Sequence, residues 1–212
     1  MQKYGFSSKL VIFAGKYKNT DIEMLTSLLA KFYDILKSAE TKYHKAKFRN
    51  NPKSKIHKSF RLGKNNYLDI SKDAEFQFAE GVTINESNNI TVKKGGRLII
   101  GKNTYITRAT IACLEKVEIG ENCILGEGLK IFDHNHQYTK EPFSVSKTEF
   151  NTAPIKLGNN VWTGANCIIL KGVTIGDNVI LGAGCVVYKD VPDNTVLINK
   201  QEQIITCIND NK

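Results

Sequence analysis

The sequence predicts an all-β solenoid, and this expectation rests on a six-residue repeat and on the residues that occupy it. From Leu157 to Pro192 the chain reads LGNNVW, TGANCI, ILKGVT, IGDNVI, LGAGCV and VYKDVP without an interruption. The first and fifth positions hold aliphatic residues, cysteine or threonine, while Gly, Asn and Asp gather between them. An α-helix cannot use a period of six, because about 3.6 residues per turn would carry the apolar positions around its surface. Short strands joined by tight turns can, and a fixed short period indicates a stack of repeats.

Three units are expected to close one triangular coil, in which each side is a short parallel strand and the first-position side chains form the core. Glycine recurs at the second position, where we expect a corner conformation closed to residues with a Cβ atom. Asparagine recurs at the fourth position and tolerates the left-handed region better than most residues. The members of these two sets are Gly158, Gly164, Gly176 and Gly182, and Asn160, Asn166 and Asn178. Two fifth-position cysteines, Cys167 and Cys185, are interpreted as small apolar core residues.

The same unit occurs earlier in the chain, in segments that start at Ile100, Ile106, Ile119, Leu125 and Ile131. The phase slips by one residue between Ile106 and Ile119, which predicts an irregular corner. Farther upstream the pattern persists only loosely, from about Leu68 to Ile90, and we place the first coil there. The predicted solenoid domain therefore covers residues 66–192, followed by a C-terminal tail, 193–212. A β-sandwich of short strands is the alternative, but sandwiches do not hold a phase over six units.

Residues 1–65 are predicted to form a basic, partly helical segment. Residues 1–69 contain 15 Lys and Arg against five Asp and Glu, whereas the rest of the chain contains 15 against 16. A helix is expected from about Asp21 to Lys47, because apolar residues recur there at helical spacing. These residues are Met24, Leu25, Leu28, Leu29, Phe32 and Leu36. The basic face is either a solvated surface or a site that attracts an acidic glycan or an anionic membrane. No nucleic-acid-binding module is present, so nucleic acid is not an expected partner.

Cysteine usage and hydropathy indicate a cytoplasmic location. No apolar run approaches the length of a membrane span, and the run from Leu10 to Gly15 is too short for a signal peptide. The five cysteines are odd in number and scattered, which is typical of free thiols in a reducing compartment.

The repeat breaks once, and the break predicts the functional site. Ile131 and Leu157 are 26 residues apart, which is not a multiple of six, so residues 137–154 are predicted to form an inserted loop. His134 and His136 lie at the root of this loop, and histidine is the usual base near neutral pH. Tyr138 follows in the loop and is predicted to contact the acceptor. The alternative interpretation is that both histidines are ordinary exposed corner residues without a catalytic role.

A metal site is not expected. A zinc site built from three histidines would need a further ligand, and only His44 and His57 remain, both in the basic segment. No Cys-x-x-Cys pair is present.

These repeats resemble the hexapeptide-repeat acyltransferases, in particular the branch of galactoside, maltose and xenobiotic acetyltransferases. The resemblance implies a left-handed parallel β-helix and a homotrimer with active sites between subunits. It also implies that the catalytic histidine ends the hexad before the inserted loop, a position that His136 matches and that His134 precedes by two residues. The γ-class carbonic anhydrases share this fold, but their three zinc-binding histidines have no full counterpart in this chain.

The resemblance extends to the binding of the acetyl donor, coenzyme A thioester. It implies that Trp162 lines the active-site tunnel and that the backbone at Gly164 and Ala165 contacts the thioester. Such N–H donors could also stabilise an oxyanion. Four further residues match coenzyme A contacts near the end of the prism: Gly182, Ala183, Tyr188 and Lys189. The chain departs from the family in its tail, where INKQEQIITCIND replaces a Gly-Asn-Pro-Ala-like turn and a helix.

The expected activity is therefore acetyl-CoA-dependent O-acetylation of a sugar hydroxyl, by direct attack and without a metal. Arg108 falls at or near the position where the family often has an acceptor-binding Asn, and we hypothesise that it binds a carboxylate. Arg108, the long loop and the basic segment favour an acidic polysaccharide. The DHNH stretch is also similar to capsule-modifying enzymes, including polysialic acid O-acetyltransferases. N-acetylation of an amino sugar or nucleotide sugar, and a non-catalytic β-helix scaffold, are the alternatives.

Overall fold

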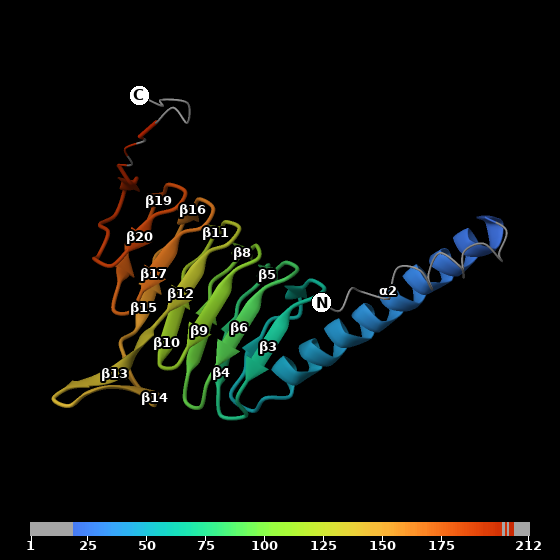
Figure 1. The fold of residues 1–212 in the computed structure, drawn as a ribbon, viewed down its shortest axis with the longest axis horizontal. Coiled ribbons are helices and arrows are strands. Elements are labelled where there is room, and N and C mark those ends of the chain that lie inside the picture. Colours follow the sequence, from blue (N-terminus) through green and yellow to red (C-terminus); the bar gives the residue numbers. More distant parts are fainter. Residues whose placement is uncertain (1–18, 201, 203, 206–212) are drawn as a thin grey trace, which may run out of the picture.

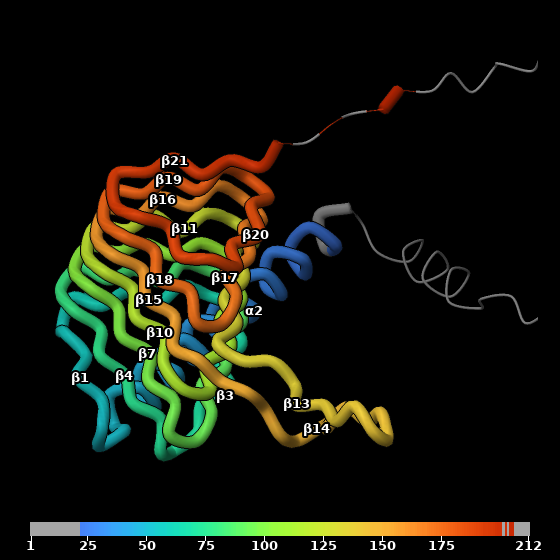
Figure 2. Tube along the Cα trace, turned by 90° about the vertical axis from the view of Figure 1, so that its left-hand side faces the viewer, coloured from blue at the N-terminus to red at the C-terminus, as the bar shows by residue number. Residues whose placement is uncertain are grey.

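The computed structural model is a parallel β-solenoid of triangular cross-section with one long helix at its N-terminal end (Figure 1). It describes residues 19–200, 202, 204 and 205. Three sheets form the sides of the prism, and successive strands pass from sheet A to sheet B to sheet C before a new coil begins. The strand order of the three sheets gives six complete coils. Figure 2 shows the coils stacked on one another. The arrangement confirms the predicted solenoid and is consistent with a left-handed β-helix.

The bounds of the strands follow the three sheets. Sheet A contains β1 (Lys55–Ile56), β4 (Glu75–Phe78), β7 (Arg97–Ile100), β10 (Lys116–Ile119), β15 (Ile155–Leu157) and β18 (Thr174–Ile175). Sheet B contains β2 (Arg61–Leu62), β5 (Thr83–Ile84), β8 (Tyr105–Ile106), β11 (Ile124–Leu125), β16 (Trp162–Thr163), β19 (Ile180–Leu181) and β21 (Val196–Leu197). Sheet C contains β3 (Tyr67–Ile70), β6 (Asn89–Val92), β9 (Thr110–Cys113), β12 (Lys130–Phe132), β17 (Ile168–Leu170) and β20 (Val186–Val187).

The coils become narrower along the chain, which explains why the repeat is loose upstream. Phe76 in β4 pairs with Leu98, which lies 22 residues later, whereas Lys156 in β15 pairs with Thr174, only 18 residues later. Strands β3, β4, β6 and β7 of sheets A and C are four residues long, so they do not fit a six-residue unit. The structure begins the solenoid at Lys55 rather than at residue 66. It also continues sheet B beyond residue 192, because β21 pairs with β19.

The interior is a continuous apolar core, as the first and fifth positions predict. Cys167 and Cys185 are buried within it, in agreement with their interpretation as core residues. Thr163 is also fully buried at a first position. Its Oγ1 accepts a hydrogen bond of 2.9 Å from the Gly126 N–H, and this bond offsets the cost of burying a hydroxyl group.

The corners use asparagine and glycine for two different reasons. The φ angles of Asn160, Asn166 and Asn178 are 55°, 58° and 56°, so the left-handed conformation predicted for the fourth position is confirmed. The expectation for the second-position glycines was wrong, because Gly158 and Gly164 do not have positive φ. A Cβ atom on Gly158 would lie 2.7 Å from the Gly176 carbonyl carbon, and one on Gly164 would lie 2.6 Å from the Ala183 nitrogen. These corners need glycine because the next coil is too close for a side chain.

The predicted irregular corner lies between β8 and β9. Arg108 occupies it with a φ of 43°, which is an uncommon conformation for a residue other than Gly or Asn. Strand β9 is then four residues long and places both Ile111 and Cys113 in the core. A shortened corner followed by a lengthened strand accounts for the one-residue slip in phase.

Helix α2 (Asn19–Arg49) confirms the predicted N-terminal helix and covers the open end of the solenoid with its last turn. Phe48 is fully buried there, and its ring lies 5.0 Å from that of Phe76, 5.5 Å from that of Phe78 and 6.1 Å from that of Phe60. The rest of the helix projects away from the prism (Figure 1). No helix in the described part of the chain has the length and apolar character needed to span a membrane.

The aromatic contacts of Phe48 predict that it is the main stabilising residue at this end. Phe48→Ala should lower the free energy of unfolding by about 3–5 kcal/mol, because it leaves a cavity and exposes the first coil. Urea titration followed by circular dichroism measures this change. Phe143→Ala is the matched control, since the Phe143 side chain is 76% exposed. Equal stability of the two variants would show that the helix does not cap the solenoid.

Candidate active site

The interruption of the repeat is a β-hairpin rather than an irregular loop. Strands β13 (His134–Lys140) and β14 (Phe143–Thr152) pair in antiparallel fashion, so the insertion predicted at residues 137–154 begins at His134. The hairpin leaves the prism at the corner between sheets C and A and projects into solvent (Figures 1 and 2). Tyr138 lies farther along it, opposite Val145, and its side chain is exposed.

His136 lies at the root of the hairpin, with one ring nitrogen held and the other free. Its Nδ1 lies 2.8 Å from the carbonyl oxygen of Ser146. A carbonyl can only accept a hydrogen bond, so Nδ1 carries the proton in the neutral ring and Nε2 holds the free lone pair. The ring of Phe150 packs against the imidazole, with 4.6 Å between ring centroids. Because His136 is exposed, Nε2 can reach an incoming substrate.

His134 is held differently, by a buried carboxylate that the sequence analysis missed. Its Nδ1 lies 3.1 Å from Oδ1 of Asp133, which is fully buried. The Asp133 carboxylate also accepts hydrogen bonds of 2.8 to 3.0 Å from the backbone N–H groups of Leu114, Glu115 and Lys116. Asp133 therefore ties the start of the hairpin to the neighbouring coil. The available signal was a charged residue at an inward-facing position directly before the two histidines.

Trp162 lies in the middle of an exposed apolar column on sheet B. Its side chain is 52% exposed, and β16 pairs with β11 on one side and β19 on the other. Residues in register with it on the neighbouring strands are also apolar and more than a third exposed. The column, called the sheet B ladder below, consists of Tyr105, Ile124, Trp162, Ile180 and Val196.

The corner between sheets B and C carries the backbone donor expected beside Gly164 and Ala165. The Gly164 N–H donates to the Leu181 carbonyl oxygen at 2.7 Å, so it is already used in the backbone hydrogen bonds between coils. Ala165 is exposed, and its N–H makes no hydrogen bond to any residue that the structure describes. Ala165 is thus the available donor of the two. Gly182 and Ala183 occupy the same corner one coil later.

Arg108 lies at the same edge of the prism, on an earlier coil. Its guanidinium lies 2.8 Å from a carboxylate oxygen of Glu127 and 3.4 Å from one of Glu86. All three side chains are exposed, so these ion pairs contribute little to stability. They do mean that an acidic acceptor would have to compete with two carboxylates for Arg108.

Tyr188 and Lys189 follow β20 at the corner between sheets C and A. The hairpin leaves the prism at the same corner, after β12. Both side chains are exposed, and Nζ of Lys189 lies 5.9 Å from the centroid of the Tyr188 ring. A lysine in this position offers a mobile positive charge that a phosphate could bind.

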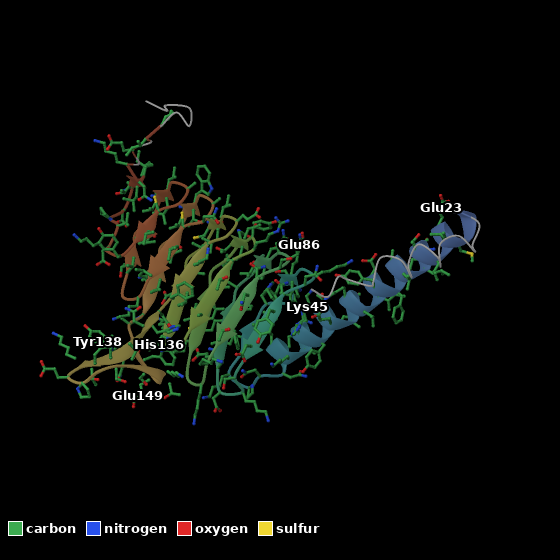
Figure 3. All side chains as sticks on the ribbon, viewed as in Figure 1. Glu23, Lys45, Glu86, His136, Tyr138 and Glu149 are labelled. Carbon is green, nitrogen blue, oxygen red and sulfur yellow. The ribbon has the colours of Figure 1, made fainter. Side chains whose placement is uncertain are left out.

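One chain does not bring all of these residues together. His134, His136, Tyr138, Tyr188 and Lys189 lie at the C–A corner, whereas Arg108, Gly164, Ala165, Gly182 and Ala183 lie at the B–C corner. Trp162 lies on the outer face of sheet B. Figure 3 shows the separation, since Glu86, one of the two partners of Arg108, lies at the opposite edge of the prism from His136.

The described residues form a surface hollow that lies away from these corners. It has a volume of about 510 Å³ and lies on sheet A near the first coils, lined by residues that include Lys55, Gln77 and Ile99. Its lining contains none of the predicted site residues. Within residues 19–200, 202, 204 and 205, no three His, Cys, Asp or Glu side chains are grouped as a metal site would require.

The buried cysteines are unsuited to nucleophilic catalysis. Burial raises the pKa of Cys113 to about 12 and raises the pKa of Cys123 and of Cys167 as well. The thiolate is the reactive form, so these groups are protonated and inaccessible near neutral pH.

Comparison with known proteins identifies the repeat. Residues 154–189 match the family model described as bacterial transferase hexapeptide (six repeats), which agrees with the repeat read from the sequence in this segment. Over 117 residues it is 37% identical to galactoside O-acetyltransferase of Escherichia coli K12, which covers 55% of this chain and 57% of that protein. Over 144 residues it is 28% identical to WbbJ of the same organism, which is named as a lipopolysaccharide biosynthesis O-acetyl transferase. That match covers 64% of this chain and 74% of WbbJ.

The chain thus spans less than two thirds of galactoside O-acetyltransferase. Among solved structures, AntD, an N-acyltransferase from Bacillus cereus in complex with dTDP and coenzyme A, has a TM-score of 0.51 at 19% identity. The match covers 66% of this chain and 79% of AntD. This likeness supports the solenoid fold.

The burial of the thiols predicts their reactivity. In a Cys207→Ser variant, the native protein should react with a thiol-specific disulfide reagent roughly a hundredfold more slowly than the urea-unfolded protein, because the remaining thiols are buried. Absorbance of the released chromophore measures the reaction. Rapid reaction of one equivalent in the native state would reveal an accessible cysteine.

Proposed function

We propose that this protein is an acetyl-CoA-dependent O-acetyltransferase that acts on a sugar hydroxyl. The observation that carries the proposal is the hydrogen bond from His136 Nδ1 to the Ser146 carbonyl, which leaves Nε2 free at the root of the hairpin. This histidine stands on a hexapeptide solenoid, and two relatives of the chain are named as O-acetyltransferases. A scaffold protein would have no need of a base held in this way.

The reaction requires one base and one stabilised oxyanion. Nε2 of His136 accepts the proton of the sugar hydroxyl as its oxygen attacks the thioester carbonyl carbon. The new C–O bond gives a tetrahedral intermediate, and the exposed Ala165 N–H is suited to donate to its oxyanion. When this intermediate collapses, the C–S bond breaks and the imidazolium returns the proton to the coenzyme A sulfur. No acyl-cysteine is needed, which agrees with the buried state of the four described thiols.

The coenzyme A thioester is proposed to lie between the two corners that flank sheet C. Gly182 and Ala183 present little side-chain bulk for its pantetheine arm, and Trp162 presents an exposed aromatic face. Lys189 would meet a phosphate and Tyr188 the adjacent part of the coenzyme. Because one chain separates these corners, a complete site needs a neighbouring subunit.

The proposed assembly is a homotrimer with active sites between subunits. The sheet B ladder supports it, because a contiguous exposed apolar column on a regular sheet is typical of an interface. The free buried thiols of the described residues support a cytoplasmic location, where such thiols stay reduced.

The proposed acceptor is an acidic, sialic-acid-type capsular polysaccharide. The excess of basic residues before residue 70 and the projecting hairpin favour a long anionic chain over a small neutral sugar. Arg108 would break its ion pair with Glu86 or Glu127 and form one with an acceptor carboxylate instead.

The assignment of the base predicts unequal effects of two matched substitutions. His136→Asn should lower kcat with acetyl-CoA by about 10²–10⁴-fold, because the amide keeps a donor for Ser146 but cannot accept the hydroxyl proton. His134→Asn should have a much smaller effect. Release of coenzyme A thiol measures kcat, and binding of coenzyme A should be unchanged in both variants. The proposal for His136 fails if His134→Asn is the inactive variant.

The acceptor proposal predicts which compounds support thiol release. Polysialic acid should be acetylated, whereas galactosides, neutral capsule glycans and amino sugars should react poorly. Arg108→Ala should raise KM for polysialic acid about tenfold and leave KM for acetyl-CoA unchanged, since it removes one charged contact. Activity on neutral sugars alone would discard the acidic acceptor, and activity on amino sugars alone would favour N-acetylation. No thiol release with any acceptor, together with no binding of acetyl-CoA, would favour the scaffold.

A further inference from the structure

An unbroken apolar stripe follows one face of helix α2. Apolar residues recur with alternating spacings of three and four residues over three heptads, which is the period of a coiled-coil seam. The stripe consists of Ile22, Leu25, Leu29, Phe32, Leu36, Ala39 and Tyr43. Leu28 and Ile35 lie beside it and widen it beyond the seam of a two-stranded coiled coil.

The stripe faces away from the solenoid. The side chains of Leu25, Leu29, Phe32 and Leu36 are between 52% and 59% exposed. Contacts with the first coil come from other faces: Asp34 pairs with Lys64 at 2.8 Å, and Thr41 donates to the Gly63 carbonyl oxygen at 3.4 Å. Figure 1 shows the helix leaving the prism, and Figure 3 places Glu23 at its far end, well away from Lys45.

A helix in this position needs a partner. The stability of most protein helices comes from packing an amphipathic face rather than from helix propensity. Between Ile22 and Phe32, the described residues show no hydrogen bond or ion pair that joins the helix to the solenoid. The exposed side chains of the stripe form one contiguous apolar surface, and such surfaces on soluble proteins mark interaction sites.

We propose that this stripe packs against helix α2 of other copies of the chain, so that the protein self-associates through its N-terminal helices as well as through its solenoid. The heptad spacing favours a helical partner over a flat surface. The charges favour protein over an anionic bilayer, because Glu23, Lys31, Asp34 and Lys37 cancel between Ile22 and Ala39. Helices that bind membrane surfaces instead carry a polar face rich in Lys and Arg. Lys42 and Lys47 lie beside the end of the stripe that is nearest the solenoid. Their like charges would oppose close packing there, so the proposed helix contact covers the first two thirds of the stripe.

The test measures the mass of the full-length protein by analytical ultracentrifugation over a range of concentrations. Leu29→Glu/Leu36→Glu disrupts the stripe, and Ser27→Glu/Ser38→Glu adds the same charge to exposed positions outside it. Both pairs are placed in the wild-type protein and in an Ile124→Glu/Ile180→Glu background, which weakens the sheet B ladder. Circular dichroism and the urea midpoint report whether the solenoid of each variant is folded.

In the ladder-disrupted background, the stripe variant should dissociate at a concentration at least tenfold higher than the serine control, because each copy loses two buried leucines. Equal dissociation of the two variants would overturn the proposal. The proposal would also be overturned if the stripe variant and the serine control had equal masses and only the stripe variant lost binding to phosphatidylglycerol vesicles. The stripe would then contact lipid rather than another helix. Acetyl transfer is not measured, so the proposed function can fail without affecting this result.

Discussion

The close stacking of successive coils is the constraint on which the rest of the structure depends. Backbone hydrogen bonds between parallel strands hold neighbouring coils about 4.8 Å apart. At that distance no room remains for a side chain at corners such as Gly158 and Gly164, where a Cβ atom would meet the backbone of the next coil. Inward side chains are forced into columns by the same spacing, so each core residue packs on its equivalent one coil away.

This regularity also decides where a functional group can be built. Side chains on an unbroken solenoid repeat at fixed positions. A segment that projects from the prism therefore requires an interruption of the repeat, and the hairpin β13–β14 is that interruption. Asp133 attaches its start to the adjacent coil through three backbone N–H groups, at the cost of a fully buried carboxylate. The base candidate His136 therefore projects from an inserted hairpin whose root is anchored to the neighbouring coil.

The predictions from sequence succeeded where one residue type has one local reason to be present. Asn160 and its equivalents were expected in the left-handed region and adopt it, because this preference is a property of the residue itself. The glycines were correctly placed at corners, but for the wrong reason, since close approach depends on the neighbouring coil. The start of the solenoid at Lys55 was missed because wider coils with four-residue strands have no hexad period.

The sequence by itself determined the solenoid, its core positions and the break beside His134 and His136, because period and residue type suffice for local geometry. Only the tertiary structure decided which candidate residues share an edge of the prism, since that depends on how many residues separate two corners of a coil. It also decided that the Gly164 N–H donates a hydrogen bond to the neighbouring coil whereas the Ala165 N–H does not. The outward turn of the α2 stripe was likewise decided by packing, because Phe48 fixes the opposite face of the helix to the solenoid.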